Sequence, residues 1–283
     1  MGNGMQVTGS VAELRGWSRA VRQAGGTVGL VPTMGALHAG HLSLVKAAQE
    51  RGDQVAVSIF VNPTQFGPQE DFAQYPRMLE ADCRLLEAAG VQRVFAPQPG
   101  TMYPDGAATF VEVEGLSGRL DGASRPGHFR GVATVVTKLL VAAEPDRAYF
   151  GQKDAAQVAV LRRMNRDLLL AVELVVCPIV READGLAMSS RNRYLSVDER
   201  REALALSRAV AAGEAAFRAG ERSAAAICAA ARREMEASEQ VRVDYVQLVN
   251  WGTLEPVETA ADGDLLAVAG WVGQTRLIDN TIL

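Results

Sequence analysis

Short apolar runs alternate with amphipathic helical stretches along the first two thirds of the chain. Each apolar run is bounded by polar, glycine or proline residues, which is typical of a buried strand. Strands that alternate with helices are typical of a parallel α/β sheet. We expect the strands at 27–33, 54–61, 91–96, 147–151 and 172–180.

The segments between these strands show the apolar spacing of helices. One helix is expected from Leu42 onward, and a second over 77–89, where Gly90 is a suitable C-terminal cap. Two more are expected over 129–143 and from about Asp154. Their apolar faces consist of Val132, Val135, Val136, Leu139, Leu140 and Ala143 in the first, and of Val158, Leu161, Met164 and Leu168 in the second.

The pattern changes after about residue 181, where helices are followed by adjacent strands rather than alternating with them. This order indicates a separate α+β domain. Its elements are two alanine-rich helices, about 197–219 and 222–237, and strands at 241–249 and 264–272.

The predicted fold class is therefore α/β, with two domains. A Rossmann-like parallel-sheet nucleotide-binding domain is expected at 1–181, and a smaller C-terminal α+β lid domain at 182–283. The hinge is expected at 180–185, so this segment would report on domain closure.

Composition and charge are those of an ordinary soluble protein. The 283 residues are 48% hydrophobic and 22% charged, with a formal net charge of −4. Because no long basic run occurs, we expect no nucleic-acid partner. The three cysteines are scattered and suggest buried thiols rather than disulfides or zinc ligands. The most apolar segment, 168–180, is too short to span a bilayer, and the N-terminal residues lack the apolar stretch of a signal peptide. We expect a cytoplasmic protein without a membrane partner.

The richest chemistry lies at residues 32–41, Pro-Thr-Met-Gly-Ala-Leu-His-Ala-Gly-His, between a predicted strand and a predicted helix. His38 and His41 are two of only three histidines in the chain. Backbone N–H groups and the positive end of a helix dipole at such a turn can dock phosphate, and imidazoles can donate to phosphate oxygens. The alternative is a capped helix start with two solvated imidazoles. The strand before and the helix after favour nucleotide chemistry.

Three further strands also end in polar residues. The strand at 54–61 leads into 62–66, the strand at 147–151 into 151–154, and the strand at 172–180 toward 188–191. Ligands of parallel α/β sheets bind at the carboxyl ends of the strands. We therefore expect these polar clusters and the histidine turn to converge on one edge of the sheet.

Motifs spread over nearly the whole chain resemble the pantoate–β-alanine ligase (pantothenate synthetase) family. This family belongs to the nucleotidyltransferase superfamily and shares its His-x-Gly-His turn with class I aminoacyl-tRNA synthetases. The blocks Asn-Pro-Thr-Gln-Phe and Gly-Leu-Ala-Met-Ser-Ser-Arg-Asn are more specific than that turn. The matching segments are 32–41, 60–66, 75–77, 94–97, 125–129, 151–154, 184–192 and 275–280.

The resemblance implies an AMP-forming ligase. ATP, supplied with Mg²⁺, would activate (R)-pantoate as pantoyl adenylate with release of pyrophosphate, and β-alanine would then displace AMP to give pantothenate. A homodimer is also implied. His38, His41 and Lys153 would be catalytic, with His38 at the position of a proton donor.

The resemblance also implies the binding residues. The ATP-binding set would be Met34, Gly35, Ala36, Leu37, His38, Ala39, Gly40, His41, Gly151, Gln152, Lys153, Asp154, Val180, Met188, Ser189, Ser190 and Arg191. Gln65 and Gln157 would bind pantoate, and Gln65 also β-alanine; carboxamides suit a ligand with a carboxylate and two hydroxyls because they donate and accept at once.

Several interpretations stay open from the sequence. Ser189–Arg191 could be a helix cap followed by a surface arginine, and Gln157 a solvated helix residue. Arg125 and His128 could line the substrate entrance or only stabilise their loop. The role of Asp154 and the metal ligands are unknown, and Gln152 stands where many relatives carry Glu.

Two rival functions also remain. One is a nucleotidyltransferase that leaves AMP or CMP on a phosphorylated acceptor. The carboxamides Gln65 and Gln157 argue against it, since a phosphate acceptor would require Arg or Lys. The other is a non-catalytic nucleotide-binding module, which would not need all four of His38, His41, Lys153 and Arg191.

Overall fold

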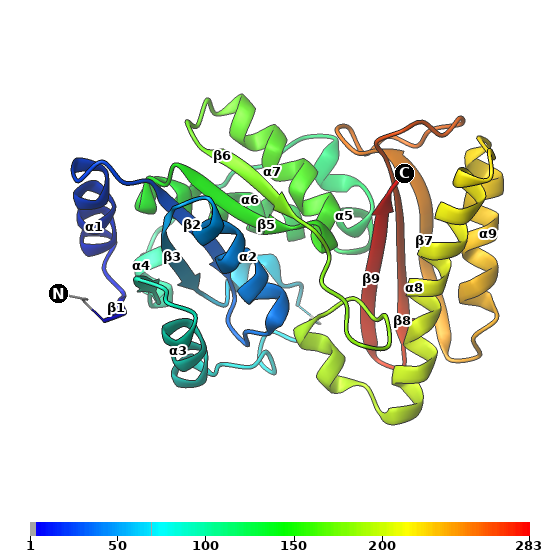
Figure 1. Cartoon of the computed structure of the whole chain (residues 1–283), viewed down its shortest axis with the longest axis horizontal. Helices are drawn as coiled ribbons and strands as arrows, with labels where there is room; N and C mark the ends of the chain where they lie inside the picture. Colours follow the sequence, from blue (N-terminus) through cyan, green and yellow to red (C-terminus); the bar gives the residue numbers. More distant parts are fainter. Residues whose placement is uncertain (1–3, 69) are drawn as a thin grey trace. The chain divides into compact units, whose positions relative to one another are not determined.

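A computed structural model describes residues 4–68 and 70–283 and divides into two compact units. The first contains residues up to Ser117, Arg125–Gly151 and Val160–Cys177, and the second contains Gly118–Ser124, Gln152–Ala159 and Pro178–Leu283. The units are interleaved in the sequence, so no single cut separates them. Figure 1 follows the chain through both.

A parallel sheet forms the centre of the first unit, as predicted. Its strand order is β1-β4-β3-β2-β5-β6, and every neighbouring pair is parallel. The strands are β1 (Gln6–Thr8), β2 (Val28–Thr33), β3 (Gln54–Ile59), β4 (Arg93–Phe95), β5 (Arg147–Gly151) and β6 (Glu173–Cys177). From β2 the chain runs through β3 and β4 in one direction and through β5 and β6 in the other. The sheet therefore has its topological switch point between β2 and β5, where doubly wound sheets bind ligands.

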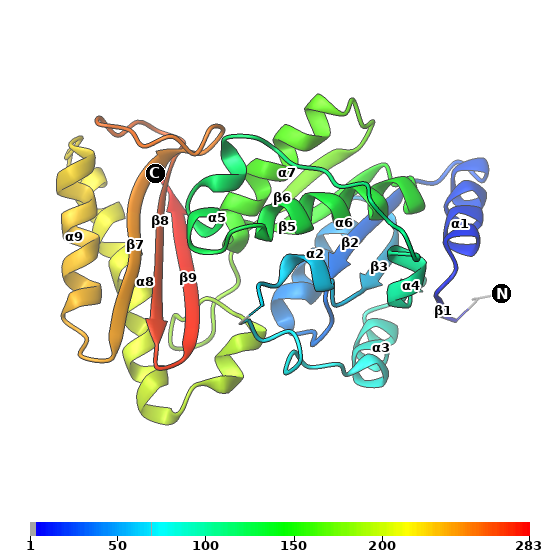
Figure 2. The same ribbon diagram turned by 180° about the vertical axis from the view of Figure 1, so that it is seen from behind.

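Helices cover both faces of this sheet: α2 lies in front of it in Figure 1, and α6 in Figure 2. The apolar residues of β2 and β3 are buried against the core-facing sides of α2 and α3, as in Val31, Val45, Val57 and Leu86. The helices, including short 3₁₀ turns (η), are α1 (Val11–Gln23), α2 (Ala39–Glu50), η1 (Pro63–Gln65), α3 (Leu79–Ala88), α4 (Pro99–Met102), η2 (Leu116–Gly118), α5 (Asp121–Ser124), α6 (His128–Ala143), η3 (Gln152–Asp154) and α7 (Ala155–Asp167).

The second unit is built on an antiparallel sheet in the order β7-β8-β9. Its elements are η4 (Ser190–Tyr194), α8 (Val197–Arg218), α9 (Ala224–Glu236), β7 (Val241–Asn250), β8 (Asp264–Val272) and β9 (Thr275–Ile282). Helices α8 and α9 pack against each other and against the sheet, with Leu206, Ile227 and Leu266 fully buried among them. Ser196 and Glu199 form a capping box that fixes the start of α8.

The predicted strands and helices are confirmed to within one to three residues at nearly every boundary. The sequence patterns missed β1, α1, β9 and the short helices α4 and α5. The helix that contains His41 begins at Ala39 rather than Leu42. The missed α1 nevertheless carries a start signal, because Ser10 accepts a hydrogen bond from the Glu13 N–H.

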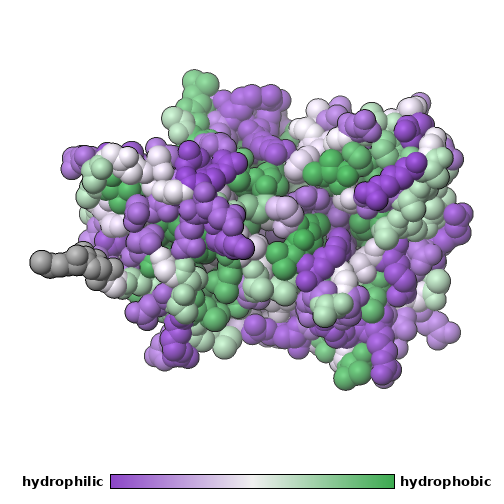
Figure 3. Space-filling model, in the orientation of Figure 1, coloured by the Kyte–Doolittle hydropathy of each residue, from purple (hydrophilic) through white to green (hydrophobic). Residues whose placement is uncertain are grey.

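The cysteines are free thiols that are buried or half-buried, and burial raises the pKa of each. Hydrophilic and apolar residues are interspersed on the face drawn in Figure 3. Within residues 4–68 and 70–283, no helix is both long and apolar enough to span a membrane.

Candidate active site

A tight turn connects β2 to α2. Gly35 and Ala36 both have positive φ, +82° and +53°. A Cβ on Gly35 would lie 2.9 Å from Oδ2 of Asp82 and 3.1 Å from Cγ2 of Ile59. Both the left-handed backbone and the lack of space therefore require glycine at position 35.

A buried carboxylate holds this turn from a neighbouring helix. Asp82, in α3, is 2% exposed and accepts hydrogen bonds from the N–H groups of Ala36 (2.9 Å) and Leu37 (2.8 Å). Sequence reasoning missed Asp82. The available signal was its position one helical turn before the fully buried Leu86, which places an acidic side chain on the core-facing side of the helix.

The two histidines cap α2 with their own rings. The His38 N–H donates to Nδ1 of His41 (3.3 Å), and the Gly40 N–H donates to Nδ1 of His38 (3.2 Å). The ring centroids lie 4.1 Å apart. A neutral imidazole whose Nδ1 accepts carries its hydrogen on Nε2. Both rings are thus set up to donate from Nε2.

The backbone N–H groups of the turn also take part in hydrogen bonds within the protein. In addition to the N–H groups held by Asp82 and by the rings, the Gly35 N–H donates to Oγ1 of Thr33 (3.1 Å). The N–H groups expected to dock phosphate therefore have acceptors within the protein.

Gln65 lies on η1, at the end of the segment that follows β3. Its Nε2 donates to the thioether sulfur of Met34 (2.9 Å), and its Oε1 accepts from Asn62 (3.1 Å). Asn62 also donates to the carbonyl of Gly131 on α6 (3.1 Å). A Cβ on Gly131 would lie 2.2 Å from the carbonyl oxygen of Thr64, so only glycine allows α6 to pack this closely against η1.

Arg125 and His128 hold the same segment from the other side. Arg125 forms a two-pronged ion pair with Glu70, at 2.6 and 2.8 Å. Nδ1 of His128 lies 2.8 Å from the carbonyl oxygen of Gln65, and Nε2 lies 3.0 Å from Nη1 of Arg125. Burial acts to raise the pKa of Glu70, but the hydrogen bond and charge of Arg125 outweigh it and lower that pKa. Of the two interpretations left open, these contacts favour support of the Gln65 loop.

Lys153 lies on η3, two residues after the end of β5. Its Nζ lies 3.3 Å from Oδ1 of Asp154, and its side chain is 22% exposed. The carbonyl groups of Gln152 and Lys153 accept hydrogen bonds from Nδ2 of Asn280, on β9 (3.1 and 2.8 Å). The turn is therefore fixed through its backbone, while the lysine head remains close to the surface.

Five further predicted residues, Val180, Met188, Ser189, Ser190 and Arg191, lie on the segment from Pro178 to η4. The Met188 N–H donates to the carbonyl of Val180 (2.9 Å), which brings these two predicted nucleotide contacts together. Ser189 caps η4 by accepting from the Arg191 N–H (3.3 Å), so the cap interpretation holds for this serine. Asn192 donates to Glu182 (2.6 Å) and thereby closes the segment into a loop.

The predicted site residues are shared by the two units. The first unit carries Met34, Gly35, Ala36, Leu37, His38, Ala39, Gly40, His41, Gln65 and Gly151, and the second carries Gln152, Lys153, Asp154, Gln157, Val180, Met188, Ser189, Ser190 and Arg191. Gln157 is half-buried in the first turns of α7. Sequence reasoning missed Asn62, Asp82 and Asn280, which support the predicted residues rather than replace them.

Comparison with known proteins places this arrangement in a family. The family model described as pantoate-beta-alanine ligase matches residues 6–282. The pantothenate synthetase of Acidobacterium capsulatum is 65% identical over 91% of this chain and 86% of its own length. That of Moorella thermoacetica is 56% identical over 99% of both chains.

Solved structures agree with this match. Pantothenate synthetase from Thermus thermophilus superposes with a TM-score of 0.93 at 47% identity, covering 98% of this chain and 99% of that one. Pantoate-beta-alanine ligase from Francisella tularensis, solved with β,γ ATP and β-alanine, gives a TM-score of 0.78 at 31% identity, covering 98% and 97%. The match over nearly all of both chains, together with the histidine turn after β2 and the lysine turn after β5, shows that this chain belongs to the pantoate–β-alanine ligase family.

Proposed function

We propose that this chain condenses pantoate with β-alanine at the expense of ATP, through a pantoyl-adenylate intermediate, and releases AMP and pyrophosphate. The observation that carries the proposal is a pair of turns, which follow the strands β2 and β5 on either side of the switch point. The turn after β2 carries the rings of His38 and His41, and the turn after β5 carries Lys153. The family match supports the choice of substrates. We propose that the residues at 182–283 act as a lid on the nucleotide domain at 1–181.

In the first step, a carboxylate oxygen of pantoate bonds to the α-phosphorus of ATP, and the bond to the bridging oxygen breaks to release pyrophosphate. Two anions must approach each other, so orientation and positive charge supply much of the catalysis. His38 and His41 would donate from Nε2 to the phosphates, and Lys153 would follow the developing charge. Ser189, Ser190 and Arg191 would bind phosphate oxygens, with Arg191 providing a two-pronged contact.

In the second step, the amine of β-alanine attacks the acyl carbon, loses a proton, and displaces AMP. We propose that Gln65 and Gln157 bind pantoate throughout. The Nε2 of Gln65 donates to the sulfur of Met34, and a thioether is a weak acceptor. Exchanging that partner for a carboxylate or hydroxyl oxygen of pantoate therefore costs little.

We propose that Mg²⁺ enters as part of the Mg·ATP substrate, held mainly by phosphate oxygens and water, as is usual for this ion. The carboxylate of Asp154 beside Lys153 is an oxygen ligand of the kind Mg²⁺ prefers and would orient a metal-bound water. We further propose a homodimer in the cytoplasm, in line with the family resemblance.

The test is ATP–pyrophosphate exchange with labelled pyrophosphate, measured with and without pantoate and without β-alanine. Exchange that requires pantoate, followed by stoichiometric AMP and pantothenate once β-alanine is added, is the expected result. A labelled nucleotide that stays on the acceptor would favour the rival transferase. ATP binding without exchange or product would favour a non-catalytic module.

A further inference from the structure

Asn280 makes contacts that a strand residue does not need for pairing with its neighbour. It lies on β9 opposite Ala267 of β8 and is 3% exposed. Its side-chain amide donates to two consecutive carbonyl groups, those of Gln152 (3.1 Å) and Lys153 (2.8 Å). These carbonyls belong to η3, which is more than a hundred residues away in the sequence.

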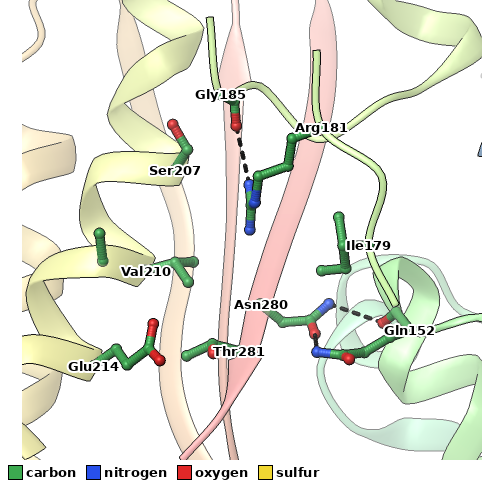
Figure 4. A pocket seen from close by; sticks show the side chains of 10 residues that line it. Gln152, Ile179, Arg181, Gly185, Ser207, Val210, Glu214, Asn280 and Thr281 are labelled. Atoms are coloured by element: carbon green, nitrogen blue, oxygen red, sulfur yellow. Dashed lines mark hydrogen bonds between the residues drawn. The ribbon is translucent and has the colours of Figure 1, made fainter. Parts of the chain in front are cut away.

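The carboxamide of Asn280 is also engaged at its oxygen. Nε2 of Gln152 donates to Oδ1 of Asn280 at 3.3 Å, so the two side chains and the η3 backbone form a closed set of hydrogen bonds. Figure 4 shows the two hydrogen bonds between Gln152 and Asn280, which line a cavity of about 400 Å³ in the second unit. A glutamate at position 152 could not donate this bond, because an ionised carboxylate only accepts.

The neighbouring residue keeps Asn280 in place. Asp279, 2% exposed, accepts the Asn280 N–H at Oδ1 (2.8 Å) and pairs with both terminal nitrogens of Arg181 (2.6 and 3.0 Å). Arg181 also donates to the carbonyl of Gly185 (3.1 Å), as Figure 4 shows. The strand that holds the lysine turn is therefore itself tied to the loop that carries Val180 and Met188.

We propose that Asn280 is a positioning residue for Lys153. This inference rests on the proposed role of Lys153 in adenylate formation. The lysine side chain is long and flexible, and its head group lies 3.3 Å from the carboxylate of Asp154. Fixing the carbonyls on either side of its Cα fixes the point from which the side chain starts. A displacement of about 1 Å at a reacting group can cost roughly a hundredfold in rate, so this anchor affects catalysis without touching a substrate.

A purely structural role for Asn280 makes a different prediction. Loss of the amide would then lower the free energy of unfolding and leave the rate per folded molecule unchanged. A positioning role lowers the maximal rate of pantoate-dependent exchange, leaves the KM for pantoate near its original value, and depends on the presence of Lys153. A double-mutant cycle separates the two roles because it reports coupling between the residues directly.

The experiment compares the full-length protein with Asn280→Ala, Lys153→Ala and the double variant, using ATP–pyrophosphate exchange at saturating ATP. Thermal unfolding gives the folded fraction of each. Thr281→Ala is the matched control, since Thr281 is the next residue on β9 and lines the same cavity. We expect Asn280→Ala to lower the maximal rate roughly tenfold, Thr281→Ala to leave it unchanged, and the double variant to be about as slow as Lys153→Ala alone.

Three results would overturn the inference. If Asn280→Ala slows the Lys153→Ala enzyme by the full factor seen in the original enzyme, Asn280 acts independently of Lys153. If Lys153→Ala slows exchange while folded Asn280→Ala does not, the inference fails and the proposed function stands. An unchanged rate in Lys153→Ala would instead reject the proposed role of Lys153 and the inference with it. Should Asn280→Ala fail to fold, Asn280→Ser, which keeps one donor, is put through the same cycle.

Discussion

Side chains hold the backbone of both turns that follow β2 and β5, but they hold different backbone groups in each. In the β2 turn, N–H groups donate to side-chain acceptors: Thr33, Asp82 and the two histidine rings. In the β5 turn, carbonyl groups accept from one side-chain donor, Asn280. The first turn is held by residues of the first unit, and the second by a strand of the antiparallel sheet of the second unit.

This difference explains how each turn presents its chemistry. Using the rings as caps commits both Nδ1 atoms of the β2 turn to the backbone, so a neutral ring carries its hydrogen on Nε2. The head group of Lys153 stands at the end of a flexible chain, so its position depends on where its backbone is held. We therefore expect the β2 turn to behave as a rigid donor pair, and the β5 turn to respond to changes in β9.

The largest effect is expected at His38, whose ring both caps α2 and is proposed to donate to a phosphate. His38→Ala removes the cap and the Nε2–H donor, so we expect a loss of roughly a hundredfold or more in turnover and about 1 kcal/mol in stability. His38→Asn restores a good capping residue but not the distant donor. Turnover should stay low while the free energy of unfolding, measured by denaturant titration, returns toward its original value.

His41→Ala should lower turnover to a similar extent, and Ser43→Ala, in the same helical turn, serves as the control. Full activity in a folded His41→Ala enzyme would contradict this view of the β2 turn, because the His41 ring would then cap the helix without contributing to catalysis.

An intermediate effect is expected at the remote anchor of the β2 turn. Asp82→Asn keeps the shape of the side chain but turns an NH₂ group toward one of the two backbone donors. We expect a loss of about 1–3 kcal/mol in stability and roughly tenfold in turnover. Denaturant titration and pyrophosphate exchange measure the two losses. Unchanged exchange per folded molecule would show that the histidine rings keep their place without Asp82.

A smaller effect is expected at Arg125, which supports the loop that carries Gln65, the residue proposed to bind pantoate. Arg125→Lys keeps the charge but loses the two-pronged contact with Glu70. We expect the KM for pantoate to rise about threefold to tenfold, because the Gln65 loop loosens, with the KM for ATP unchanged. Steady-state kinetics with each substrate varied in turn provide the measurement. Equal increases in both KM values would contradict a role limited to the Gln65 loop.

The sequence was sufficient to predict most of the sheet, because buried parallel strands are continuous apolar runs and the helices between them are amphipathic. The strand β9 was missed for a physical reason. Its residues include Asp279 and Asn280, which look like surface residues in a sequence but are buried and hydrogen-bonded. Strand β1 has only three residues and no detectable period.

The residues of the candidate site also differ in how far the sequence could predict them. Residues with distinctive chemistry, such as His38, His41 and Lys153, could be identified from their place after a strand and from family motifs. The residues that support them could not be predicted, because Asp82 and Asn280 contact segments that are distant from them in the sequence. The partners of a buried polar group depend on tertiary contacts that no local pattern records.

The smallest effect expected is a pH dependence of the Gln65 loop. Arg125 lowers the pKa of Glu70 below the ordinary value of 4.5. A carboxyl whose pKa falls on folding adds stability that is fully present above 4.5 and is lost as the pH falls through the lowered pKa. The Arg125–Glu70 pair is only partly shielded from solvent, with side chains 17% and 26% exposed, so we expect about 1 kcal/mol or less. Denaturant titrations of the original protein and of Glu70→Gln should differ most at neutral pH and converge in acid. A difference that stays constant with pH would mean that Glu70 supports the Gln65 loop by packing rather than through the charge of its ion pair with Arg125.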